Sequence, residues 1–279
     1  MKLKANAKIN LSLDVVGKRE DGYHLIDSVF QSVSLCDDIV VEKSDTVSVA
    51  CDNNTICDKS NIAYKAAQKF FEYVGISGGA EIIIKKNIPL AAGLGGGSAD
   101  AAAVIVALDR LYETNLSQDT LCEIGLSVGA DVPFCIMGGT ARVGGIGEKM
   151  TELPDMPDCA ILLIKHGIKQ STADMYKKID CCPQSEFYTQ AVVEAIENGD
   201  LNKLCKNVSN SFSCVCDNTE LINDIKTTNP QAVSLSGSGP TVFAIYNNIG
   251  DASNAKNTLE QKSYKPIIAA SSKIGLIFE

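Results

Sequence analysis

The 279-residue sequence lacks any long apolar run and any excess of positive charge. No apolar stretch approaches the roughly 20 residues that a membrane-spanning helix needs, and the N-terminus alternates polar and apolar residues, unlike a secretory signal. The net charge is −9 and the pI about 4.9, which argues against a broad surface for nucleic acid or anionic membrane. We therefore expect a cytoplasmic protein without a nucleic-acid or membrane partner, and its oligomeric state, monomer or homodimer, stays open.

Histidine is also scarce, because the chain has only two, against eleven cysteines. The cysteines lack the C-x-x-C spacing of a zinc knuckle; Cys181 and Cys182, for example, are adjacent. A Cys/His metal site is therefore not expected. The hypothesis of a thiol redox protein is supported by the number of cysteines alone. We predict free, buried thiols in a reducing compartment, such as Cys122, Cys135 and Cys159.

The bulk composition, 45% hydrophobic and 21% charged, is that of a globular protein. The length favours two domains or two lobes over one small unit. A connector rich in proline and aspartate at 153–158 predicts domains at 1–153 and 154–279. The succession of strand clusters and helices favours an α+β class over a regular alternation of strands and helices.

Residues 3–15 alternate strictly between apolar and polar side chains, which predicts a strand with one buried face. Lys8 and Asn10 then project from the same face, because successive side chains of a strand point to opposite sides. Taken alone, this segment favours a solvated polar face on an outer strand.

Periodicity and turn residues predict the other elements. Further strands are expected at 38–42 paired with 47–51, and at 80–85, 140–143, 159–164, 232–236, 241–246 and 273–278. Helices are expected at 61–74, 98–112, 117–128, 172–179, 186–198, 219–229 and 253–261.

The most informative stretch is the glycine loop at 93–98, which has four glycines in five positions and opens a helix. Glycines there cost backbone entropy, but they let the chain curl closely around a ligand. Free N–H groups and the helix dipole at a helix N-terminus favour phosphate. A Walker loop is excluded because no lysine follows Gly97, and a dinucleotide fingerprint fails because Ser98 replaces its last glycine.

Residues 89–99 resemble the second signature of the GHMP kinases, P-x-x-x-G-L-G-(G/S)-(G/S)-S-(A/S). The Gly-Ser turn within 234–243 resembles the third signature. Residues 7–11 and 19–24 resemble the first signature of those members that phosphorylate a cytidine diphosphate sugar alcohol for isoprenoid synthesis, and 129–134 completes the pattern. The resemblance implies a two-lobed GHMP kinase fold, with an N-terminal ATP-binding lobe, a C-terminal lobe and the active site in the cleft between them.

The resemblance also implies residue roles. Lys8 and Asp131 are expected to be catalytic. Without the resemblance, Lys8 would be interpreted as a surface lysine and Asp131 as a helix cap. Residues expected to bind ATP are Pro89, Leu90, Ala91, Ala92, Gly93, Leu94, Gly95, Gly96, Gly97, Ser98 and Ala99 around the phosphates, and Asn61 and Lys86 near the adenine.

For the small-molecule substrate, a cytidine diphosphate sugar alcohol, the resemblance implies a second set of contacts. The expected substrate residues are Asn10, Tyr23, His24, Tyr176, Gly237, Ser238 and Gly239. Tyr176 has the weakest claim, since a helix residue after Ser171 and Thr172 is more often simple packing. No Asp/Glu pair is evident for a protein-held metal, so we expect Mg²⁺ to arrive with ATP.

Two alternatives remain at this stage. One is another GHMP kinase, of the homoserine or mevalonate type, although the Asp21-Gly22-Tyr23-His24 segment speaks against it. The other is a non-catalytic nucleotide-binding protein on the same fold, although such a protein would not need both Lys8 and Asp131. The segment 165–172 carries a lysine and a glutamine where members of the family often have small or apolar residues, so the wall of the substrate pocket is not defined.

Overall fold

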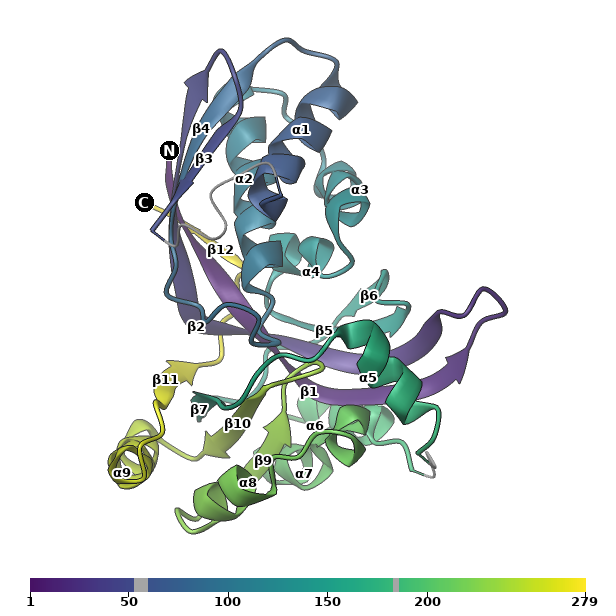
Figure 1. The fold of residues 1–279 in the computed structure, drawn as a ribbon, viewed down its shortest axis with the longest axis vertical. Helices are drawn as coiled ribbons and strands as arrows, with labels where there is room; N and C mark the ends of the chain where they lie inside the picture. The colour runs from purple at the N-terminus through teal and green to yellow at the C-terminus, as the bar shows by residue number, and fades with distance from the viewer. Residues whose placement is uncertain (53–59, 183–185) are drawn as a thin grey trace.

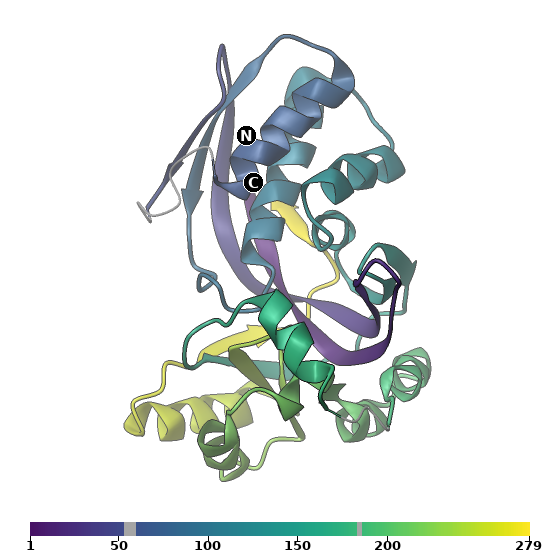
Figure 2. The same ribbon diagram turned by 45° about the vertical axis from the view of Figure 1, so that its right-hand side comes forward.

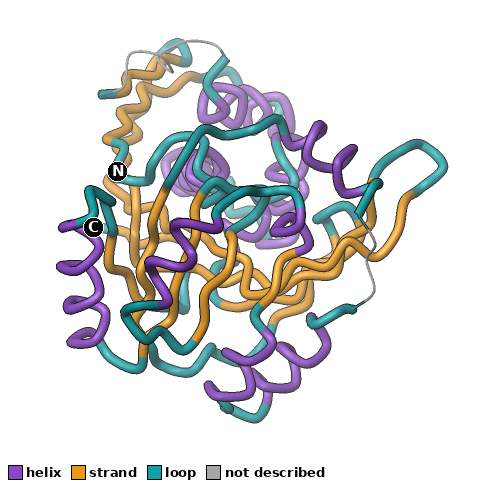
Figure 3. Tube along the Cα trace, turned by 60° about the horizontal axis from the view of Figure 1, so that its bottom comes forward, coloured by secondary structure: helices purple, strands orange, loops and turns teal. Residues whose placement is uncertain are grey.

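The computed structural model describes residues 1–52, 60–182 and 186–279. It confirms the α+β class and shows two lobes joined by a long pair of strands (Figure 1). The strands of both sheets run through the molecule with helices flanking them (Figure 3). Within the described ranges, one sheet has eight strands and the other has four.

The joining pair consists of β1 (Lys2–Lys18) and β2 (His24–Ser44), which are antiparallel along almost their whole length. The prediction that β1 has one buried face is wrong, because both faces are buried. Asn10 and Ser12 are fully buried and Asp14 is 2% exposed. Asp14 accepts the backbone N–H groups of two residues at the start of helix α6 (Thr189–Glu197), at 2.9 and 2.8 Å. Hydrogen bonds to such partners, which are distant in sequence, stabilise the buried polar face.

The N-terminal lobe is built on the larger sheet, in the order β12-β1-β2-β4-β3, with β5 and β6 continuing from β2. Its helices lie against one side of this sheet (Figure 1). Its further elements are β3 (Ser48–Cys51), α1 (Ile62–Val74), β4 (Gly79–Lys85), α2 (Gly96–Tyr112), α3 (Gln118–Val128), α4 (Val132–Met137), β5 (Thr140–Gly145) and β6 (Lys149–Glu152).

The expected pairing of 38–42 with 47–51 is wrong. Strand β3 pairs in parallel with β4, and β4 lies between β3 and β2. The chain crosses over because β2 continues to Ser44 and takes β4 as its neighbour there, with Ser44 opposite Gly79. Helix α4 was not predicted as an element, although Pro133 in its first turn is a favourable N-terminal residue.

The C-terminal lobe contains the second sheet, in the order β11-β7-β10-β9. Its helices agree with expectation except α7, which was missed, as was β11; α9 begins earlier than expected. The elements in this part of the chain are β7 (Ala160–Lys165), α5 (Thr172–Ile179), α6 (Thr189–Glu197), α7 (Leu201–Asn207), β8 (Ser209–Asn210), the 3-10 turn η2 (Ser211–Cys214), α8 (Thr219–Lys226), β9 (Ala232–Leu235), β10 (Thr241–Tyr246), α9 (Ile249–Gln261) and β11 (Ile267–Ala270). The short strand β8 and the final strand β12 (Leu276–Phe278) pair with β1 in the larger sheet.

The two lobes are connected by more than one passage of the chain. The final strand β12 returns to the N-terminal lobe and pairs with β1, Leu3 opposite Phe278. A single hydrophobic cluster lies between the lobes and includes Ile9 of β1, Leu94 of the glycine loop and Phe243 of β10. Helix α5 also lies where the lobes meet (Figure 2). The glycine loop is thus supported by both lobes, while the predicted boundary near residue 153 stays a prediction.

The three cysteines singled out from the sequence are free thiols in the structure. Burial raises the pKa of Cys122 to about 11 and that of Cys159 to about 12, and it raises the pKa of Cys135 further. Thiols that stay protonated are poor nucleophiles and poor metal ligands. Among the described helices, none combines the length and apolarity needed to cross a bilayer.

Candidate active site

The glycine loop delivers the chain to the N-terminus of α2 through Gly95, which has φ 71°. No side chain caps this end of the helix, so its first N–H groups are available to an anion. A Cβ atom at Gly95 would lie 2.9 Å from Cγ of Lys8, and Lys8 donates its backbone N–H to Leu94 at 2.9 Å. Glycine is therefore required for the loop to lie directly on Lys8.

The Gly-Ser turn that follows β9 packs against the other side of the loop. Ser236 Oγ donates to the Gly93 carbonyl at 2.9 Å, and a Cβ atom at Gly93 would approach the Gly239 carbonyl to 2.9 Å. The Gly237 N–H donates to Asn10 Oδ1 at 2.9 Å. The three segments that resemble the family signatures, distant in sequence, therefore meet at one place.

The proposed catalytic pair lies beneath this meeting point. Lys8 Nζ is 3.4 Å from Asp131 Oδ2, with side-chain exposures of 5% and 34%. Asp131 stands at the N-cap position of α4, yet its side chain makes no capping hydrogen bond. Its carboxylate is therefore directed at Lys8 and at solvent, not committed to the helix end.

Lys8 is held in place by neighbours that do not neutralise it. Its ammonium donates to Asn10 Oδ1 at 2.9 Å and lies 4.1 Å from the ring centroid of Phe30. Phe30 in turn contacts Phe134 of α4 edge-to-face, at a centroid distance of 5.3 Å, so one aromatic contact positions both members of the pair. Asn10 is fully buried, and its Nδ2 donates to Ser28; its contact with the sugar-alcohol chain stays a prediction.

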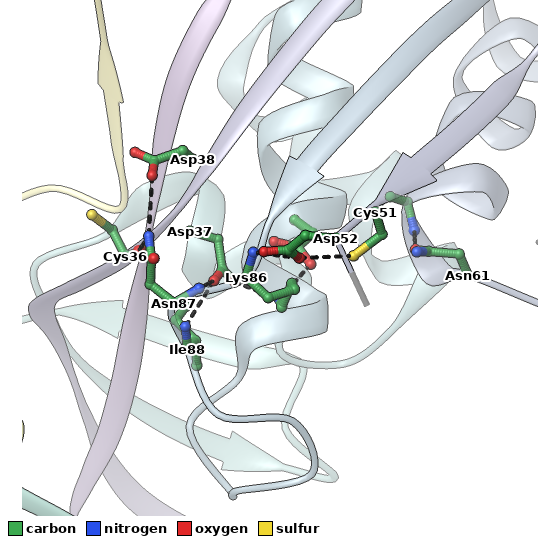
Figure 4. Close-up of polar contacts among 11 residues, drawn as sticks. Cys36, Asp37, Asp38, Cys51, Asp52, Asn61, Lys86, Asn87 and Ile88 are labelled. Atoms are coloured by element: carbon green, nitrogen blue, oxygen red, sulfur yellow. Dashed lines mark hydrogen bonds and ion pairs between the residues drawn. The ribbon is translucent and has the colours of Figure 1, made fainter. Parts of the chain in front are cut away.

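A second buried lysine, Lys86, lies under the start of α2 and was not expected to have acidic partners. Its ammonium pairs with Asp37, which lies beside it in Figure 4. It also pairs with Asp100, at 2.6 Å, and the side chains of all three residues are 6% exposed or less. Asp37 also accepts the backbone N–H groups of Asn87 and Ile88, at 2.6 and 2.8 Å. This triad fixes the segment that leads into the glycine loop.

The charges within this triad are unequal, since one ammonium meets two carboxylates. Burial raises the pKa of Asp100. Burial lowers the pKa of Lys86, but Asp100 and Asp37 outweigh it and raise that pKa overall. Lys86 also lines the cavity of the glycine loop, whereas Asn61 caps α1 by accepting the Ala63 N–H at 2.8 Å. Contacts of Lys86 and Asn61 with adenine stay predictions.

A separate cavity of about 560 Å³ is lined by the β1–β2 hairpin and α5; we call it the nucleoside cavity, after the ligand expected from the sequence. Tyr23, which is 61% exposed, His24 and Tyr176 of α5 all line it, and their contact with cytosine stays a prediction. The His24 and Tyr176 rings are stacked at a centroid distance of 4.5 Å. Tyr176 also contacts Phe212 edge-to-face, and burial raises the pKa of Tyr176 to about 12, so its hydroxyl stays protonated.

Two residues near these cavities were missed from the sequence. Asp180, just after α5, accepts from His24 Nε2 and from Lys18 Nζ, each at 2.6 Å, so it fastens the β1–β2 hairpin to α5. Lys169 lies in the segment before α5 and lines the cavity of the glycine loop. No sequence pattern indicates that Asp180 pairs with Lys18 and His24. Lys169, in contrast, could be recognised as a departure from the family pattern.

Comparison with known proteins agrees with this geometry. The model of the GHMP kinases N terminal domain matches residues 61–139, and that of the GHMP kinases C terminal matches 192–265. The 4-diphosphocytidyl-2-C-methyl-D-erythritol kinase of Clostridium perfringens is 41% identical over 271 residues, covering 94% of each chain. That of Caldicellulosiruptor saccharolyticus is 44% identical over 269 residues, covering 93% of each.

This chain belongs to the GHMP kinases, among the 4-diphosphocytidyl-2-C-methyl-D-erythritol kinases. The crystal structure of a 4-(cytidine 5'-diphospho)-2C-methyl-D-erythritol kinase has a TM-score of 0.80 and 30% identity, covering 98% of this chain and 99% of that one. The homoserine kinase of Cytophaga hutchinsonii has a TM-score of 0.76 at 19% identity. At that identity the second match shows a shared fold alone.

Proposed function

We propose that this GHMP kinase transfers the γ-phosphoryl group of ATP to the 2-hydroxyl of 4-diphosphocytidyl-2-C-methyl-D-erythritol in the non-mevalonate isoprenoid pathway. The observation that carries the proposal is the Lys8–Asp131 pair directly beneath an uncapped helix N-terminus in a glycine loop. Phosphoryl transfer needs such positioning and charge neutralisation more than covalent chemistry by the protein.

In this mechanism the 2-hydroxyl oxygen forms a bond to the γ-phosphorus while the bond from that phosphorus to the β-phosphate oxygen breaks, leaving ADP. Asp131 orients the hydroxyl and accepts its proton. Lys8, paired with Asp131, balances the charge on the moving phosphoryl group. The N–H groups at the start of α2 hold the phosphates that do not move.

Magnesium accompanies the nucleotide in this proposal. In the described part of the chain, no three His, Cys, Asp or Glu side chains gather as a metal site. The Ser98 hydroxyl lies in the first turn of α2, where a side-chain oxygen suits Mg²⁺, and phosphate oxygens and water would supply the remaining ligands. The ion would neutralise phosphate charge.

The nucleoside cavity supports cytidine as the second recognition element. Tyr23 and Tyr176 line the same cavity, and aromatic rings stack favourably on a base. His24, oriented by Asp180 and Tyr176, supplies an edge contact. The segment 169–176 connects this cavity to that of the glycine loop, since Lys169 lines one and Tyr176 the other.

The test is phosphorylation by the purified protein of three alcohols: the cytidine diphosphate substrate, homoserine and mevalonate. We expect ADP release with the first alone, and a product whose new phosphate is on the 2-hydroxyl by phosphorus NMR. Asp131→Asn, prepared in parallel, controls for a contaminating kinase. Turnover of homoserine or mevalonate without the cytidine substrate would overturn the assignment, and nucleotide binding without turnover of any alcohol would favour a non-catalytic binding protein.

A further inference from the structure

The segment between β7 and α5 carries Lys169, which lines the cavity of the glycine loop. Lys169 Nζ donates to Ser238 Oγ at 2.6 Å and to the Gly239 carbonyl at 2.7 Å. Both acceptors are neutral, and among the residues that the structure describes no carboxylate forms an ion pair with Lys169. A partly buried ammonium without a counterion is costly unless an anion joins it.

The anion that this cavity is built to take is phosphate. The same cavity, of about 280 Å³, is lined by the loop from Pro89 to Ser98 as well as by Lys169. Lys8 lies on the other side of the loop, against Gly95. The turn that accepts from Lys169 also donates the Gly237 N–H to Asn10, which accepts from the Lys8 ammonium, so Lys169 lies toward the reacting end of the site.

We propose that the Lys169 ammonium binds the terminal phosphate of ATP and, with Lys8, balances the charge on that group as it is transferred. The proposal rests on the kinase function proposed above. Lys169 then provides charge from the C-terminal lobe, while Lys8 and the start of α2 provide it from the N-terminal lobe. In the free protein, Ser238 and Gly239 hold the ammonium in position.

The surroundings of Lys169 add a pH dependence. Burial, and then the nearby Lys8, lower the pKa of Lys169 to about 8, against the opposing effects of Cys216 and Asp131. In the free enzyme the ammonium is therefore protonated below about pH 8 and lost above it, whereas bound phosphate favours the protonated form. We expect kcat/KM for ATP to fall as the pH rises above about 8 while kcat is maintained to higher pH, because the two parameters report the free and the bound enzyme.

The experiment measures nucleotide affinity by calorimetry, with β,γ-imido ATP and with ADP, at pH 7 and pH 9. We expect Lys169→Met to bind the ATP analogue about 10-fold or more weakly at pH 7, the size of a lost charge-assisted contact, and to bind ADP unchanged. Lys169→Arg should restore analogue binding and abolish its loss at pH 9. Lys256→Met removes the same charge from exposed α9 and should behave as wild type.

Equal losses of analogue and ADP affinity in Lys169→Met would overturn the assignment to the terminal phosphate. Unchanged affinity for both nucleotides would overturn any phosphate role. These outcomes are distinct from a failure of the proposed function, in which the wild-type protein itself does not phosphorylate the cytidine substrate. Thermal unfolding of each variant shows whether a lost affinity comes from a lost fold.

Discussion

The phosphate end and the nucleoside end of this site are built in opposite ways. At the phosphate end, backbone lies on backbone, and its two central side chains, Lys8 and Lys86, are 5% and 6% exposed. At the nucleoside end, Tyr23 is 61% exposed, and Asp180, which links the hairpin to α5, is 36% exposed. The proposed chemistry thus rests on packed main chain, and the proposed base recognition on side chains, of which Tyr23 and Asp180 reach the surface.

This difference predicts how each end responds to change. Main-chain packing leaves no room to adapt, so a single added carbon at the phosphate end should be severe. Single ring contacts and partly exposed ion pairs are individually modest, and salt screens the ion pairs. Substitutions at the two ends should therefore have different effects. Those at the phosphate end should affect ATP binding and turnover, and those at the nucleoside end should affect KM for the cytidine substrate.

The largest effect is expected for Gly95→Val. The new side chain would meet Lys8 at 2.9 Å and would force a β-branched residue into a φ of 71°. We expect ATP binding to fall below detection by calorimetry. Gly75→Val is the matched control, because Gly75 has φ 69° with nothing within 4 Å of its Cβ position; it should lose about 1–2 kcal/mol of stability and keep ATP binding. Normal ATP affinity in Gly95→Val would refute the proposal that the glycine loop binds the phosphates of ATP.

The next effect is expected for Asp131→Asn, which keeps the shape of the side chain and removes its charge and basicity. We expect kcat to fall by about 10²- to 10⁴-fold, the usual contribution of a general base, while ATP affinity is largely retained. Steady-state kinetics with calorimetry for ATP checks both parts. Loss of ATP affinity with unchanged turnover of the bound complex would show that Asp131 organises the nucleotide site and not the hydroxyl.

The same contrast explains how much could be predicted from sequence. The glycine loop was predicted from its residues, because its function depends on local backbone freedom. The polar face of β1 was interpreted wrongly, because alternation cannot distinguish a solvated face from one whose partners lie far along the chain, as Asp14 and the start of α6 do. The Asp37–Lys86–Asp100 triad and Lys169 escaped for the same reason: their positions depend on packing between distant segments.

At the nucleoside end, Tyr176→Leu should raise KM for the cytidine substrate about 10-fold, since an aromatic stack is worth about 0.5–1.5 kcal/mol beyond its area. KM for ATP should not change. Tyr264→Leu is the control: Tyr264 also contacts a histidine, His166, at 5.5 Å, but it does not line the nucleoside cavity. An unchanged KM for the cytidine substrate in Tyr176→Leu would mean that Tyr176 only packs against Phe212.

The smallest effect is expected for Asp180→Asn. This change removes the charge that holds both Lys18 and His24, yet the pair is partly exposed and solvent weakens it. We expect KM for the cytidine substrate to rise about 2- to 3-fold at low salt, and the difference from wild type to shrink at high salt as screening increases. Asp174→Asn, at an exposed acid on α5 that pairs with Lys177, should show neither effect. If Asp180→Asn and Asp174→Asn have the same KM for the cytidine substrate, then the ion pair to Asp180 does not orient His24. The stacking contact with Tyr176 would then orient it alone.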